Sequence, residues 1–176
     1  FFQFFDRLVA NVTLGTTGIG DGRTAATFNG TTSLVDIYSA SLAGAFNVGE
    51  HTLSIWFKLA SSTPTDGAAR RMLSLTADGN NRSILHKSAT NNVITPLQVA
   101  GGTQKTQNIT FSDLGWHQFY ASISKANDRM LTYLDGVSQG TQTGLGTWIG
   151  ALLSTGCCIG SNSTTPANVH SGVLAH

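Results

Sequence analysis

Short segments in which apolar and polar residues alternate dominate this sequence, and they most restrict what it can fold into. In the segment 52–59, every second residue is apolar, namely Leu53, Ile55, Phe57 and Leu59. The segments 34–38, 93–99 and 116–124 alternate in the same way. A period of two places the apolar side chains on one face of a β-strand. The alternation therefore predicts strands that each have one buried face.

Turn-forming residues separate the alternating segments at intervals of about eight to twelve residues. Asp135-Gly136, the dipeptide that a type I′ hairpin prefers, stands between the segments 130–134 and 137–139. No stretch of about ten residues has an apolar period of 3.6, and only residues 39–46 allow one short helical turn. The sequence therefore predicts an all-β sandwich or barrel.

The length and the apolar content suit one domain. The chain has 176 residues, of which 40% are hydrophobic, and this is enough for a core. Glycines are frequent between Gly15 and Gly22, as in a flexible connection. We predict an N-terminal arm or linker over residues 1–22 and a single domain over residues 23–176. The aromatic opening Phe1–Phe5 lacks the basic leader of a signal peptide.

The charge balance and the length of the apolar runs exclude two kinds of partner. Ten Lys and Arg residues against nine Asp and Glu residues give a formal net charge of +1, and the only basic cluster is the doublet Arg70-Arg71. A protein that binds nucleic acid usually has a clear excess or clustering of basic residues, which this sequence does not have. No apolar run approaches the roughly 20 residues that cross a bilayer. We predict no nucleic-acid partner and no membrane insertion.

The two cysteines, Cys157 and Cys158, are adjacent. In a strand their side chains point to opposite faces, and a disulfide between them closes a strained ring. We predict two free thiols, one buried and one near the surface.

The acidic residues do not suit hydrolysis. Most glycosidases need two carboxyl groups about 5 to 10 Å apart. Glu50 is the only glutamate, and the aspartates are scattered singly, mostly in turns. The segment Gly136–Gly140 matches the G-x-S-x-G pattern of serine hydrolases, but it follows a hairpin turn and no helix follows it. We predict a non-catalytic protein, and only an inverting pair of aspartates distant in sequence stays open.

Calcium is the one ion for which the sequence offers ligands. The histidines have no metal-ligand spacing, and no other cofactor is indicated. Asp78, with Asn80 and Asn81 beside it and Asp66 in the preceding loop, forms the best cluster of oxygen ligands. The alternative is a solvated turn, because the spacing of a dedicated calcium loop is absent.

Trp148 is the candidate for contact with a ligand, together with Asn80 and Asn81. It lies in the loop-like segment Gly146–Gly150, and an exposed tryptophan can stack on a sugar ring or anchor a protein interface. The alternative for Trp148 is packing in the core.

Several segments, taken in order, resemble one family. Residues 115–119 (G-W-H-Q-F), followed by residues 131–137 (L-T-Y-L-D-G-V), are the most specific of them. Further matches lie at 25–37, 46–58, 158–160 and 171–174. Together they resemble the concanavalin A-like lectin/glucanase superfamily, in its laminin G-like branch.

The resemblance implies a two-sheet antiparallel jelly-roll sandwich over about residues 24–176. In that family the final strand normally continues past the position of His176, so truncation, or completion by a neighbouring segment, is expected. The glutamate cluster of the family's glucanases has no counterpart here, and its calcium ligands match no residue of this chain. Activity therefore does not transfer.

The family implies two functions. The first is a recognition module on a virion or cell surface that binds a glycan or a surface receptor. The second is an assembly, decoration or fibre subunit of a virus particle or extracellular filament, with no sugar ligand. Contacts with other subunits are expected through the N-terminal arm and the last strand. Both functions imply an extracellular, cell-surface or virion location.

Overall fold

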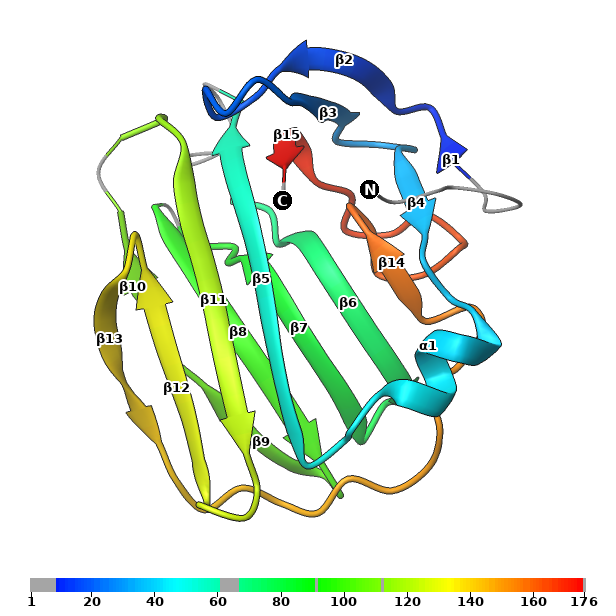
Figure 1. Ribbon diagram of the computed structural model, residues 1–176, viewed down its shortest axis with the longest axis vertical. Coiled ribbons are helices and arrows are strands. Elements are labelled where there is room, and N and C mark those ends of the chain that lie inside the picture. Colours follow the sequence, from blue (N-terminus) through cyan, green and yellow to red (C-terminus); the bar gives the residue numbers. More distant parts are fainter. Residues whose placement is uncertain (1–8, 61–66, 91, 112, 176) are drawn as a thin grey trace.

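The computed structural model describes residues 9–60, 67–90, 92–111 and 113–175, and it is a sandwich of two antiparallel sheets (Figure 1). Sheet A contains, in spatial order, β1 (Val9–Ala10), β4 (Leu34–Asp36), β14 (Cys157–Ile159), β6 (Arg70–Asp78), β7 (Asn81–Lys87), β8 (Val93–Ala100) and β10 (Ile109–Thr110), and β9 (Thr103–Thr106) also pairs with β8.

Sheet B contains β13 (Val137–Gln142), β12 (Arg129–Leu134), β11 (His117–Ser124), β5 (Glu50–Leu59), β15 (Ser171–Ala175), β3 (Thr24–Asn29) and β2 (Thr13–Thr17). All strand pairs within the two sheets are antiparallel. The predicted two-sheet antiparallel jelly roll is confirmed.

The alternating segments form the strands that the sequence predicts. In β5, Leu53, Ile55, Phe57 and Leu59 are all buried, and Phe57 has no exposed surface. In β11 the buried positions again fall on every second residue. These side chains meet those of sheet A in one core between the sheets. Burial of apolar surface at about 25 cal/mol per Å² holds the two layers together.

The turns also follow the sequence. Asp135 and Gly136 have φ values of +52° and +76°, as a type I′ turn requires at both central positions. The one short helix, α1 (Ala40–Ala45), begins after Ser39, whose side chain accepts a hydrogen bond from the backbone N–H of Leu42. No helix in the described part of the chain is long and apolar enough to cross a membrane.

The described part of the predicted arm pairs with the sandwich. β1 pairs with β4 at the edge of sheet A, and β2 pairs with β3 at the edge of sheet B. The hydroxyl groups of Thr16 and Thr27 are 2.6 Å apart across the second pair. β1 and β2 are therefore edge strands, because β3 and β4 each offer backbone groups for pairing on that side. The aromatic segment Phe1–Phe5 lies outside the described residues.

The last strand lies inside sheet B. β15 pairs with β3 on one side and with β5 on the other. Its pairing with β5 covers Trp56–Leu59 only. Within the described residues, the part of β5 before Trp56 is therefore open toward β3.

Both cysteines are free, as predicted, and both are fully buried. The prediction that one thiol lies near the surface is wrong. Cys157 belongs to the core between the sheets. Cys158 faces the other way, where Asp36 and Ser74 flank it on the neighbouring strands β4 and β6. Burial raises the pKa of Cys157 to about 11 and that of Cys158 to about 12.

Candidate ligand-binding face

The outer face of sheet A, which is turned away from sheet B, carries the candidate site. Side chains alternate between the two faces of a strand. Leu85 of β7 belongs to the core between the sheets, so Arg82, Ile84 and His86 lie on the opposite face. Ile84 packs there in a separate apolar cluster with Leu97 and Val99 of β8.

The strand register places polar residues in rows across this face. Arg71 of β6 lies directly opposite His86 of β7, and His86 lies opposite Thr95 of β8. Thr95 donates a hydrogen bond from its hydroxyl group to the side-chain oxygen of Asn108, at 3.1 Å. Arg82 lies opposite Thr76 and Val99, two rows further along and beyond the row of Ile84. We call Arg71, Arg82 and His86 the cationic cluster.

The cationic cluster contains nitrogen atoms that lack a partner. Nε and Nη1 of Arg71, Nε of Arg82 and Nδ1 of His86 are shielded from water, and none has a hydrogen-bond partner among the described residues. Leaving a buried donor without a partner costs about 1 to 3 kcal/mol, so such groups are uncommon and call for an explanation. Each of the three side chains is only half-buried. Part of each can therefore meet a ligand.

The electrostatics of the cluster leave it positive. Burial and the charge of Arg71 lower the pKa of His86 to about 3, so its ring is neutral at pH 7. Burial, followed by the charge of Arg82, lowers the pKa of Arg71. Asp36 is on the same face but two strands away from β6, on β4.

The two arginines of the basic doublet have different surroundings. Arg70 donates from Nη1 to the backbone carbonyls of Gly30 at 2.7 Å and Val169 at 3.1 Å. The Arg70 side chain is therefore part of the fold. Arg71 instead belongs to the outer face, where its fork of N–H donors has the geometry that binds carboxylate or phosphate groups.

Trp148 lies in the core and not on the surface. It is 7% exposed, its ring packs edge-on against Phe46 and His51, and Nε1 donates to the carbonyl of Gly150 at 3.1 Å. This location matches the core-packing alternative. Burial and these contacts leave little of the indole surface for a ligand.

The predicted calcium ligands form a turn that is closed by hydrogen bonds. Asp78 accepts bonds from the backbone N–H of Asn80 at 2.7 Å and from the amide of Asn81 at 3.0 Å. The amide oxygen of Asn81 accepts from the N–H groups of Gly101 and Ile149, both at 2.9 Å. Asn81 is buried, whereas Asn80 is exposed.

No set of three His, Cys, Asp or Glu side chains within the described ranges is placed to hold a metal ion. Asp66 lies outside those ranges. Calcium binding stays a prediction, and the internal bonds around Asp78 give its carboxylate a structural role.

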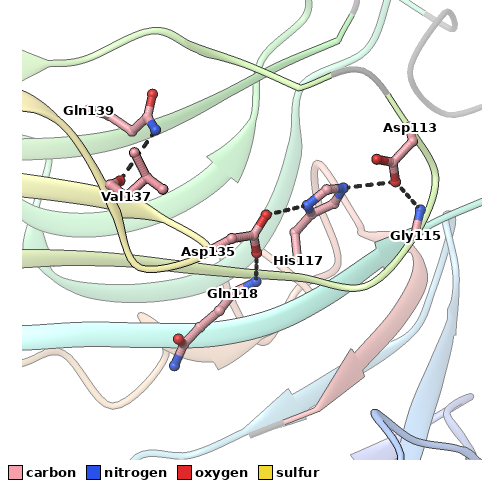
Figure 2. A network of polar contacts seen from close by, with 7 residues as sticks. All are labelled: Asp113, Gly115, His117, Gln118, Asp135, Val137 and Gln139. Carbon is pink, nitrogen blue, oxygen red and sulfur yellow. Dashed lines mark hydrogen bonds and ion pairs between the residues drawn. The ribbon is translucent and has the colours of Figure 1, made fainter.

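A second polar network ties the end of β11 to the hairpin turn of β12 and β13 (Figure 2). The ring of His117 contacts Asp135 through Nδ1 at 2.8 Å and Asp113 through Nε2 at 3.2 Å. The other oxygen of Asp135 accepts from the backbone N–H of Gln118 at 2.8 Å. The contacts join three segments, and His117 itself is only 8% exposed. We assign this network to the fold.

A groove of about 1200 Å³ lies between the sheets where β15 stops pairing with β5. Its walls are mainly apolar and come from both sheets, including Leu53 and Ile55 of β5, Leu75 of β6 and Leu174 of β15. Val9 of β1 also lines the groove. The volume exceeds that of most small-molecule sites, and the strand edge along one wall suits an added strand.

The cationic cluster was not among the predicted site residues, although the sequence carries a signal for it. The turn-forming residues Asp78–Asn81 separate the segments 71–76 and 82–88, and this pattern indicates two paired strands. Pairing these two segments around the turn places Arg71, Arg82 and His86 on one face. This face is opposite to the core, where polar residues at alternate positions normally form solvated surface, and the pattern alone therefore does not single them out.

No protein-family model matches this sequence, and no curated protein matches it. Solved structures with low sequence identity share its fold. The CBM40 domain of the Ruminococcus gnavus IT-sialidase, bound to α2,3-sialyllactose, has a TM-score of 0.67 and 15% identity, over 85% of each chain.

Two further structures are similar. The binding domain of botulinum neurotoxin serotype D has a TM-score of 0.68 and 14% identity, over 96% of this chain and 40% of that chain. Mouse laminin α1 domains LG4-5 have a TM-score of 0.60 and 12% identity, over 95% of this chain and 43% of that chain. This chain thus corresponds to less than half of those two chains. All three neighbours are lectin-like β-sandwich domains, and the likeness concerns the fold.

Proposed function

We propose that this protein is a non-catalytic recognition module of the laminin G-like branch, and that it binds a glycan or a glycan-bearing surface receptor at the outer face of sheet A. The observation that carries the proposal is the cationic cluster. Its side chains are half-buried, so part of each is open to a ligand, and its buried donors have no partner among the described residues.

The fold supports the same proposal. A carbohydrate-binding domain and a toxin binding domain have the same sandwich. Fold alone does not decide function, so the assignment depends on the residues of the face. Asn108 is exposed, and it accepts a hydrogen bond from the buried Thr95 beside the cationic cluster. An exposed amide group of this kind pairs with sugar hydroxyls.

The acidic residues support binding without catalysis. Asp135 and Asp113 both contact the ring of His117. Asp78 accepts a hydrogen bond from the backbone N–H of Asn80 within its own turn. Glu50 accepts bonds from the Ser124 hydroxyl and the Ala126 N–H. We therefore assign no carboxyl pair to hydrolysis, and we expect an extracellular, cell-surface or virion location.

A glycan array tests the proposal. The folded protein is screened with calcium and then with a chelator, and selective, saturable binding is expected. Reversal of charge in Arg82→Glu should abolish the signal. Arg129→Glu is the matched control, because Arg129 is exposed on β12 of the other sheet. A well-folded protein that binds no glycan and no cell surface would falsify the proposal.

The groove favours a second candidate function, that of a subunit in a virus particle or extracellular filament. Residues Thr52–Ile55 line the groove, and within the described residues they have no strand partner on that side. A strand from a neighbouring subunit, with apolar residues at alternate positions, would pair with this edge. Sedimentation of the chain with its natural assembly tests this. Ser54→Pro, which does not alter the outer face of sheet A, should reduce co-sedimentation because proline blocks a strand edge.

A further inference from the structure

The end of β15 leaves a slot in sheet B that continues the line of this strand. β15 pairs with Trp56–Leu59 of β5 on one side and with β3 on the other, and it lies beside the last part of β5 only (Figure 1). Beyond its end, the slot is bordered by Thr52–Ile55 of β5 and by Thr24 and Ala25 of β3, all of which line the groove. Neighbouring strands lie about 4.8 Å apart. The slot is therefore one strand wide where β15 ends.

The groove behind this slot is apolar. Its far wall comes from the inner face of sheet A and includes Val35, Leu73 and Leu75. Among the described residues that line the groove, Arg23 is the only one with a charge. An open strand edge beside an apolar wall suits an added strand that carries apolar side chains.

One apolar segment of this chain adjoins the groove and lies outside the described residues. Residues 1–8 have the sequence F-F-Q-F-F-D-R-L, and they directly precede Val9, which lines the groove. The other residues outside the described ranges, at 61–66, 91, 112 and 176, include no Phe, Trp, Tyr, Val, Leu, Ile or Met. Of these segments, residues 1–8 are therefore the one whose chemistry matches the groove.

We propose that residues 1–5 occupy the slot as a strand between β3 and β5 of the same chain, with the side chains of Phe2 and Phe4 toward the core. The length of the segment allows this. Val9 pairs with Val35 at the edge of sheet A, and the two sheets of a sandwich lie about 10 Å apart. About three residues of extended chain, at about 3.3 Å each, cross this distance. Residues 6–8 therefore suffice for the crossing, and residues 1–5 are left to pair.

The polar residue of the segment decides which face turns inward. In an extended segment, Phe2 and Phe4 point to one face and Gln3 points to the other. Thr52 and Ser54 of β5 are exposed on the outer face of sheet B, which is turned away from sheet A. With both phenylalanines inward, the amide of Gln3 joins these hydroxyl groups. The reverse orientation would bury the amide, which costs free energy unless it finds a partner.

The inference goes beyond the recognition proposed for sheet A and concerns the groove alone. Open strand edges beside apolar surface invite association between chains. Residues 1–5 would cover this edge within a single chain. A strand from a neighbouring subunit would then have to displace them before it could pair with β5.

Hydrogen exchange tests whether the slot is filled. NMR follows the amides of Thr52–Ile55 that point away from β11 in the full chain. The double variant Phe2→Ser/Phe4→Ser removes the inward side chains, and Phe1→Ser/Phe5→Ser is the matched control with the same composition. We expect exchange at least about tenfold faster in the first variant than in the wild type, and little change in the control. Equal exchange in the wild type and the first variant would overturn the proposal.

Cysteine pairs test where the strand comes from, and they do not require the serine variants to fold. Gln3→Cys is combined with Thr52→Cys or with Ser54→Cys. The matched control combines it with Ser122→Cys, which lies on the same outer face but one strand further away, on β11. The two native cysteines are fully buried and do not compete. We expect a disulfide within one chain for at least one of the β5 positions and none for the control, because a disulfide needs neighbouring Cβ atoms.

The remaining outcomes also decide the proposal. Disulfides between two chains would show that a second copy supplies the strand, which would overturn an occupant from the same chain. Absence of a disulfide at both β5 positions would overturn the pairing with β5. Neither result bears on the proposed glycan binding, which the array and Arg82→Glu test on the other sheet.

Discussion

His117 and Asp135 join β11 to the turn between β12 and β13, with 2.8 Å between the ring Nδ1 and the carboxylate Oδ2. An ionised carboxylate only accepts hydrogen bonds, so the ring donates. This bond joins the segments 115–119 and 131–137, which carry the most specific resemblance in the sequence. It fixes the start of β11 against the turn between β12 and β13.

Loss of this contact should weaken the fold. Asp135→Asn keeps a side chain that tolerates the positive φ of +52° at this position but loses the charge-assisted bond. Because the Asp135 side chain is 46% exposed, we expect a loss of only about 1 kcal/mol in the free energy of unfolding. Urea unfolding measures it. Asp21→Ala, an exposed turn residue, is the control, and equal losses in both variants would contradict the assignment.

Asn81 should matter far more than Asn80. Asn81→Ala leaves the N–H groups of Gly101 and Ile149 without their acceptor. We expect a loss of about 2 to 4 kcal/mol in the free energy of unfolding. Asn80→Ala, in the same turn but exposed, should cost less than about 0.5 kcal/mol. Chemical denaturation of the two variants gives the comparison, and a stable Asn81→Ala protein would argue against a structural role.

Acid should destabilise the protein through its buried histidines. His170 has no exposed surface, and burial followed by the charge of Arg70 lowers its pKa from 6.5 to about 3. The unfolded chain binds the proton first, so stability is full above pH 6.5 and falls as the pH drops toward 3. We expect His170 alone to cost about 2 kcal/mol between pH 7 and pH 5.

His51 and His86, with pKa values lowered to about 4 and about 3, add to this loss. Urea unfolding at several pH values measures it. In His170→Leu the loss on acidification should be smaller than in the wild type. Identical pH dependence of the two proteins would show that His170 does not contribute.

The cysteines should not react in the folded protein. Both thiols are fully buried, and their pKa values are raised to about 11 and about 12, so thiolate is scarce at pH 8. Iodoacetamide should label neither residue under native conditions and both in concentrated guanidinium chloride. Mass spectrometry counts the labels. Native labelling at the rate of a free thiol would contradict this burial.

Gly146 should tolerate no side chain. A Cβ atom there would lie 1.8 Å from the carbonyl oxygen of Ala100, which is backbone and cannot move freely. Gly146→Ala should therefore lower the melting temperature clearly. Gly44→Ala in α1 is the control, because a Cβ at Gly44 meets nothing within 4 Å and alanine favours a helix. The control should melt no earlier than the wild type.

The strands and their buried faces could be predicted because each depends on a local pattern. The alternation at 52–59 and the turn at Asp135-Gly136 both reappear in the structure. The burial of Trp148 could not be predicted, because its partners Phe46 and His51 are distant in sequence. The same holds for the cationic cluster, which depends on the register of two strands and on their orientation toward the core.

The place of β15 between β3 and β5 determines how this domain can fold. The strand comes from residues 171–175, whereas its neighbours come from residues 24–29 and 50–59. Sheet B therefore cannot close until these distant parts of the chain meet, and contacts of such high sequence separation make folding slow. Until then, the strands on either side present open edges and an uncovered core. Expression at low temperature or with chaperones should therefore raise the yield of soluble protein.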